Sequence, residues 1–82
     1  MTLSSGVWKI TYTDDYREGE WDGYWRLTST SKNRFKVECQ LEDNTFEHCM
    51  GDHELMWNVR TKQWYMYTVM SIVRVVKYSK IE

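Results

Sequence analysis

Strict alternation of apolar and polar residues marks the clearest secondary structure in this chain. In the range 7–13, every second residue from Trp8 to Tyr12 is apolar, and the residues between them are polar. The ranges 24–30 and 34–42 alternate in the same way. Side chains on a strand point to opposite faces with period two, so these ranges predict antiparallel strands with one face in the core and one in water.

Polar segments connect the predicted strands. The segment 14–22 contains five acidic residues and one arginine, which predicts a solvated connection. Residues 21–24 resemble a turn that enters the second strand. The segments 31–33, 42–44 and 61–63 predict hairpin loops, because short polar side chains hydrogen-bond to nearby backbone and Asn tolerates a positive φ.

The chain after residue 44 is harder to divide into elements. Residues 45–52 are irregular and predict at most a short strand, whereas residues 55–60 alternate again. The range 64–78 is an almost unbroken apolar run, and we expect one long strand bent by a bulge, because β-branched side chains suit a pleated sheet. A helix is the alternative for part of this run, since helical spacing relates Val69, Ile72, Val73 and Val76.

Short strands joined by tight polar turns predict an all-β fold. The expected architecture is a small antiparallel meander of about five or six strands, curled into a barrel or half-barrel. A chain of 82 residues is too short to divide its core, so we expect residues 1–82 to form a single domain. Aromatic residues make up 16% of the chain, and a few of these large rings suffice to fill a small core.

Charge, terminal sequence and cysteine content bear on where the protein works. A net charge of −1 gives no global attraction to nucleic acid or to a membrane. The N-terminal residues have neither the basic start nor the apolar stretch of a signal peptide, and the 64–78 run is too short to span a bilayer. We therefore expect a cytoplasmic protein with no membrane partner, in which Cys39 and Cys49 are free thiols; a disulfide is the alternative.

One cluster of residues resembles a metal site. Four side chains of the kind that tetrahedral zinc requires have the spacing C-x8-H-C-x3-H, at Cys39, His48, Cys49 and His53. The usual C-x2-C knuckle is missing, and the middle two residues are adjacent. The sequence therefore favours no metal and no cofactor, with a zinc-stabilised small domain as the weaker alternative.

Catalytic signatures are absent from the sequence. It contains no nucleophile elbow, phosphate-binding glycine loop, metalloprotease motif or dinucleotide fingerprint. His48 and Cys49 are adjacent and would point to opposite faces of a strand, which argues against a thiol nucleophile with a neighbouring base. We expect no enzyme activity and no small-molecule substrate. Size and composition are typical of small inhibitors and adaptors encoded by phages.

The chain has more aromatic residues than one face of each strand requires. The rings assigned to the core are Trp8, Tyr12, Trp25, Phe35, Trp57, Tyr65 and Tyr67. The large side chains then left outside are Trp21, Tyr24, Met56, Trp64 and Met66. Such residues are enriched at protein interfaces, so we expect a non-catalytic binding module of the inhibitor or adaptor type, whose partner is another protein or a second copy of itself.

A second binding hypothesis concerns the basic residues. The range 23–37 contains four Lys or Arg residues and no acid. If the strands pair as neighbouring hairpins, one outer face of the sheet carries Tyr24, Arg26, Arg34, Lys36, Asn58 and Arg60. Small barrels use such a mixture of rings and cations to bind single-stranded nucleic acid, so nucleic-acid binding is the alternative function.

Overall fold

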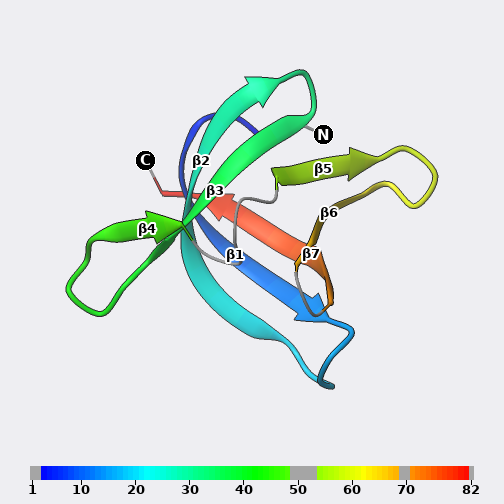
Figure 1. Ribbon diagram of the computed structural model, residues 1–82, viewed down its shortest axis with the longest axis horizontal. Coiled ribbons are helices and arrows are strands. Elements are labelled where there is room, and N and C mark those ends of the chain that lie inside the picture. The colour runs from blue at the N-terminus through cyan, green and yellow to red at the C-terminus, as the bar shows by residue number, and fades with distance from the viewer. Residues whose placement is uncertain (1–2, 49–53, 69–70, 82) are drawn as a thin grey trace.

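The computed structural model describes residues 3–48, 54–68 and 71–81, which form a seven-stranded sheet (Figure 1). The strands are β1 (Gly6–Asp14), β2 (Trp21–Ser31), β3 (Arg34–Gln40), β4 (Phe46–His48), β5 (Glu54–Asn58), β6 (Gln63–Tyr67) and β7 (Ile72–Lys80). Within those ranges no helix forms, and the predicted all-β fold is confirmed.

Six of the strands close into an antiparallel barrel. The order around the ring is β2-β1-β7-β6-β5-β3, and β3 pairs back onto β2. In the order of the sequence, β1 is the first strand of the ring and β7 is the last. These two strands pair from Trp8–Lys80 to Asp14–Val73 and so close the ring. The remaining strand, β4, pairs with β3 outside the ring and belongs to a hairpin that projects from the barrel (Figure 1). The predicted curled meander is therefore a closed barrel.

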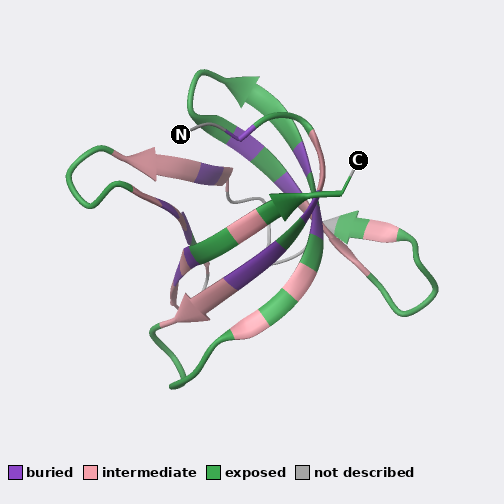
Figure 2. Ribbon diagram, turned by 180° about the vertical axis from the view of Figure 1, so that it is seen from behind, coloured by how far each residue is buried: buried purple, intermediate pink, exposed green. Residues whose placement is uncertain are grey.

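Inward-facing side chains fill the barrel. The buried apolar residues are Leu3, Trp8, Ile10, Trp25, Leu27, Phe35, Val37, Leu55, Trp64, Met66, Val73 and Val75. Along β2 and β3, buried positions alternate with exposed ones (Figure 2). The alternation predicted for the first three strands is confirmed with two exceptions. Thr11 is buried although it belongs to the outer face, and Leu41 is exposed beyond the end of β3.

The predicted single strand over 64–78 is wrong, and so is its helical alternative. This run forms two strands, β6 and β7, that pair with each other from Tyr65–Arg74 to Tyr67–Ile72. The backbone amide of Thr68 donates to the Ser71 carbonyl at 2.8 Å, and the Ser71 amide donates to the Thr68 hydroxyl at 2.9 Å. These bonds join the two strands without the glycine, proline or asparagine by which turns are recognised in a sequence.

A register shift interrupts the alternation of inward and outward residues in β7. Thr11 pairs with Lys77, whereas its neighbour Tyr12 pairs with Val75, so Val76 is an extra residue in β7. Such a β-bulge reverses the alternation beyond it. Val73 and Val75 therefore point inward before the bulge and Tyr78, which packs against the core, points inward after it.

Two smaller expectations are also corrected. Residues 21–24 belong to β2 rather than to a turn, and Gly23 lies opposite Ile10 in the ladder. A Cβ at Gly23 would lie 3.4 Å from the Trp25 indole nitrogen, so this glycine leaves room for a core ring. The strand expected over 55–60 ends at Asn58. Within the range 45–52, residues 46–48 form β4, and residues 49–52 lie outside the described residues.

The expected free thiol at position 39 is wrong. Cys39 is disulfide-bonded, and the only other cysteine in the sequence, Cys49, lies outside the described residues. Disulfides persist mainly in oxidising compartments, so the cytoplasmic expectation loses the support that it drew from free thiols. In the described part of the chain, no helix has the length and apolar character needed to cross a membrane.

Candidate functional site

The outward side of β6 differs from the prediction. Trp64 and Met66 were expected outside, but their side chains are 3% and 0% exposed in the core. Tyr65 and Tyr67 were expected in the core, but they point outward, and Tyr67 is 49% exposed. Four consecutive large apolar residues show no alternation, so either face assignment satisfied the pattern, and the choice was wrong by one residue.

The β5–β6 hairpin contained a signal that could have fixed this choice. Trp57 was correctly assigned to the core, and it is at least half-buried there. In an antiparallel pair, residues directly opposite each other share a face. Trp57 lies opposite Trp64 in the ladder, so an inward Trp57 requires an inward Trp64 and an outward Tyr65.

The other three residues predicted to bind a protein occupy separate places. Trp21 lies opposite Tyr12, is half-buried, and is covered by the Arg17 guanidinium at 4.2 Å from its ring centroid. Tyr24 is 44% exposed on β2, opposite Lys9. Met56 is half-buried on β5, opposite Tyr65. Of the five predicted residues, only Met56 therefore lies beside the exposed tyrosines.

The outward side chains of β5, β6 and β7 form a surface that we call the tyrosine face, made of Met56, Tyr65, Tyr67, Ile72 and Arg74. One ladder row joins Met56, Tyr65 and Arg74, and the next row joins Tyr67 and Ile72. The two tyrosine rings meet edge to face, with centroids 5.3 Å apart and an interplanar angle of 89°. Because each ring packs against the other, the pair is held in a defined orientation while one ring remains open to solvent.

A small hollow opens on the tyrosine face. Its volume is about 100 Å³, and it is lined by Asn58, Thr61, Gln63, Tyr65, Tyr67, Ile72 and Arg74. Pockets that enclose a small-molecule ligand are several times larger, on the order of 300–1,000 Å³. This hollow has the size to receive one side chain of a partner rather than a substrate.

Unpaired positive charge lies at one edge of the tyrosine face. The sequence has no acidic residue from 55 to 81. Arg74 of the face is paired with Asp15, and the neighbouring Arg34 of β3 is paired with Glu54 of β5. Arg60 and Lys62, both exposed in the β5–β6 turn, take part in no ion pair among the described residues. The edge of the face at this turn is therefore positively charged.

The residues predicted to bind nucleic acid are brought together only in part. Tyr24, Arg26, Arg34 and Lys36 share the outer face of β2 and β3, but Asn58 and Arg60 lie at the β5–β6 turn, where the Asn58 side chain accepts the Arg60 amide at 2.9 Å. Acids also occupy the shared face. Glu38 accepts a hydrogen bond from Arg26 at 3.0 Å, which raises the pKa of the guanidinium, and Glu54 lies opposite Lys36 and 3.7 Å from Arg34.

The zinc alternative loses one of its ligands. A sulfur held in a disulfide is not the thiolate that binds zinc, so Cys39 does not fit the site. His48 lies in β4 opposite Glu38, while Cys49 and His53 lie outside the described residues. Among the residues that the structure describes, no group of three or more His, Cys, Asp or Glu side chains is arranged to hold a metal ion.

No family model matches the chain, and no curated protein or solved structure matches it either. The function of the tyrosine face must therefore be inferred from its own side chains.

Proposed function

We propose that this protein is a non-catalytic binding module that engages a protein partner through the tyrosine face. The observation that carries the proposal is the outward pair Tyr65 and Tyr67 on a barrel whose interior is already filled by other large side chains. The barrel core does not need these rings. A surface that holds two tyrosines, a methionine and an arginine has the composition of the central part of a protein interface.

The geometry of the face favours a macromolecular partner. Tyr65 and Tyr67 fix each other by their edge-to-face contact, so little side-chain entropy remains to be lost when a partner covers them. The adjacent hollow of about 100 Å³ would receive a single side chain of the partner. Binding of this kind would act by occluding or bridging the partner's surface, as inhibitors and adaptors do.

The charge at the edge of the face specifies the partner further. An acidic surface on the partner would complement Arg60 and Lys62, which lie at the edge of the face. We therefore infer a partner with acidic residues around an apolar centre.

Nucleic acid is the less favoured partner. On the outer face of β2 and β3, Arg26 is paired with Glu38 of β3, and Arg34 is paired with Glu54 of the adjacent β5. Phosphate binding there would have to displace those carboxylates, which reduces the electrostatic gain on which nucleic-acid affinity depends. Tyr24 remains exposed on that face and provides the comparison needed in the test.

The experiment is affinity capture from a lysate of the native cell with matched double variants. Tyr65→Ser plus Tyr67→Ser removes the two rings of the tyrosine face, and Tyr16→Ser plus Tyr24→Ser removes two exposed rings elsewhere. We expect the first variant to lose a captured protein by at least about tenfold, as for interface hot spots. The second variant should retain that protein, and nuclease treatment should not release it.

Charge reversal tests the inferred chemistry of the partner. Arg60→Glu plus Lys62→Glu should weaken capture of the same protein, chiefly by slowing association. Equal capture by all variants would contradict the proposal, as would loss in the Tyr16 and Tyr24 control or release by nuclease. Recovery of only the chain itself, with a dimer mass in light scattering that the tyrosine variants abolish, would show self-association instead of a separate partner.

A further inference from the structure

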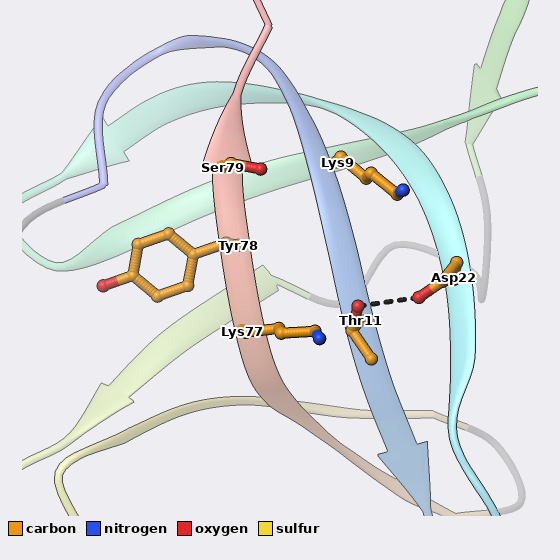
Figure 3. A pocket seen from close by; sticks show the side chains of 6 residues that line it. All are labelled: Lys9, Thr11, Asp22, Lys77, Tyr78 and Ser79. Carbon is orange, nitrogen blue, oxygen red and sulfur yellow. Dashed lines mark hydrogen bonds between the residues drawn. The ribbon is translucent and has the colours of Figure 1, made fainter.

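A second hollow lies over the neighbouring strands β2, β1 and β7. Its volume is about 340 Å³, and it is lined by Lys9, Thr11, Asp22, Lys77, Tyr78 and Ser79 (Figure 3). The Tyr78 ring projects from the opposite side of β7, away from the other labelled side chains (Figure 3). The hollow is therefore a polar site formed by two lysines, two hydroxyl residues and one carboxylate, separate from the tyrosine face.

The ladder places these side chains in two adjacent rows. Lys9 lies opposite Ser79, and Thr11 lies between Asp22 on one side and Lys77 on the other. Thr11 is only 6% exposed although it belongs to the outer face, so it forms the floor of the hollow. Both lysine side chains extend toward the pair formed by Thr11 and Asp22 (Figure 3).

The charges of this site are incompletely compensated. The Thr11 hydroxyl donates a hydrogen bond to the Asp22 carboxylate at 2.7 Å, so the buried hydroxyl at the floor of the site has a partner. Neither Lys9 nor Lys77 lies within ion-pair distance of Asp22 or of any other acid that the structure describes. Two ammonium groups and the exposed Ser79 hydroxyl thus remain available as hydrogen-bond donors above the floor.

We propose that this hollow binds an oxyanion of the phosphate class between Lys9 and Lys77. A tetrahedral oxyanion presents several acceptor oxygens in different directions, so it can accept from both ammonium groups and from the Ser79 hydroxyl at once. Two positive charges exceed the one negative charge of Asp22, which leaves the site attractive to an anion. Asp22 opposes binding by charge while it holds Thr11 in place.

Removing the lysine charges and removing the Asp22 charge should change the phosphate affinity in opposite directions. Lys9→Gln plus Lys77→Gln removes both charged donors and should weaken phosphate binding by about tenfold or more, as expected for charge-assisted hydrogen bonds. Asp22→Asn keeps an oxygen that can accept the Thr11 hydroxyl but removes the negative charge. This variant should bind phosphate several-fold more tightly.

The measurement is titration of the whole protein with inorganic phosphate at constant ionic strength, followed by amide chemical shifts in NMR. We expect saturable shifts at Thr11, Asp22 and Ser79. Lys32→Gln plus Lys62→Gln, and Glu42→Gln, make the same charge changes at exposed positions in other turns and should leave the affinity unchanged. Retained spectral dispersion in each variant shows that the barrel is folded.

Two further ligands separate the sources of the phosphate group. Thymidine monophosphate and an oligothymidylate are titrated in separate arms, and binding of either that is lost with both lysines supports the site. Shifts that never saturate with any of the three ligands would overturn the proposal. So would weaker binding by Asp22→Asn, or binding that survives in the double lysine variant.

Discussion

Two residues adjacent in the sequence, Trp64 and Tyr65, have opposite roles because they point to opposite sides of β6. Trp64 packs in the core against Phe35, with ring centroids 5.5 Å apart, and against Trp57 at 5.3 Å. Tyr65 and Tyr67 pack only on the outer surface, against each other. The physical difference between the two sets is the apolar area that each removes from water when the chain folds.

We expect Trp64→Ala to lower the free energy of unfolding by about 3–5 kcal/mol, because it leaves a large cavity between two rings. Tyr67→Ala should lower it by less than about 1 kcal/mol, since that ring is half exposed. Urea unfolding followed by circular dichroism measures both. A loss at Tyr67 equal to that at Trp64 would show that the tyrosine face belongs to the core.

A different consequence of burial concerns Tyr78, whose hydroxyl is buried and has no hydrogen-bond partner in the described part of the chain. Burial raises the pKa of Tyr78 above the ordinary value of 10.0, and it raises that of Tyr12 as well, although Arg17 opposes the shift at Tyr12. The fold therefore favours the neutral phenol. This contribution to stability is present below about pH 10 and is lost as the pH rises through the raised folded-state pKa.

Tyr78→Phe should stabilise the protein by up to about 1 kcal/mol at neutral pH, because it removes an unsatisfied buried hydroxyl and keeps the ring against Trp8. The variant should also lose less stability than the parent between pH 9 and pH 11, a range chosen to bracket the ordinary phenol pKa of about 10. Urea unfolding at several pH values measures both effects. Tyr16→Phe, at an exposed ring, is the control and should change neither. Destabilisation by Tyr78→Phe would show that the hydroxyl has a partner.

At the scale of the element, alternation predicted strands well where one face meets water. The first three strands follow their patterns because polar residues separate the apolar ones, as from Trp8 to Tyr12. The last third of the chain lacks such polar residues, so its division at Thr68 and Ser71 and the bulge at Val76 left little trace in the pattern. The division depends on hydrogen bonds between Thr68 and Ser71 themselves, and the bulge depends on the pairing of β7 with β1, which is distant in the sequence.

The same ambiguity explains the outcome at the candidate site. The presence of surplus rings was readable from composition, and the exposure of Tyr24 followed from clear alternation in β2. The identity of the exposed pair on β6 depended on register across the β5–β6 hairpin, which composition does not contain. The hollow between Lys9 and Lys77 depends on the pairing of β1 with β7, which are far apart in sequence, so no local pattern predicts it.

The β5–β6 turn offers a stability prediction at this scale. Lys62 has a φ of 55°, in the left-handed region, and its amide donates to the Asn58 carbonyl at 2.8 Å. Asn33 in the β2–β3 turn and Asn44 in the β3–β4 turn have similar values, and asparagine tolerates this region better than lysine. Lys62→Asn should therefore raise the free energy of unfolding by about 0.5–1 kcal/mol.

Urea unfolding of Lys62→Asn beside Lys62→Gln measures this effect. The glutamine variant removes the same charge but has no preference for the left-handed region, so it should give no gain. Equal stability of the two variants would mean that backbone strain at this position is negligible.

On the scale of the whole molecule, the ladders that join the strands of the barrel differ in length. β1 pairs with β2 along Gly6–Tyr12 and with β7 along Trp8–Asp14, so this side has long ladders. On the opposite side, β5 pairs with β3 over Glu54–Met56 and with β6 over Met56–Asn58. Short ladders with few bonds open at lower free energy than long ones.

Amide hydrogen exchange should therefore be slowest in β1 and in the strands that flank it, β2 and β7. Amides of β5 and β6 should exchange through local opening, at rates faster by about tenfold for each 1.4 kcal/mol of difference in opening free energy. Uniform protection around the ring would contradict this expectation and would show that the barrel opens only as one unit. The tyrosine face lies on the side expected to open first.

Closure of the ring between β1 and β7 also has a consequence for biosynthesis. While the ribosome is still making residues 72–80, the strand edges that β7 will cover, on β1 and β6, have no neighbour. Unpaired edges of this kind template intermolecular association, and contacts between segments distant in sequence form slowly. The nascent chain thus passes through an interval in which these two edges are open to association, and the interval ends when β7 emerges and pairs with both.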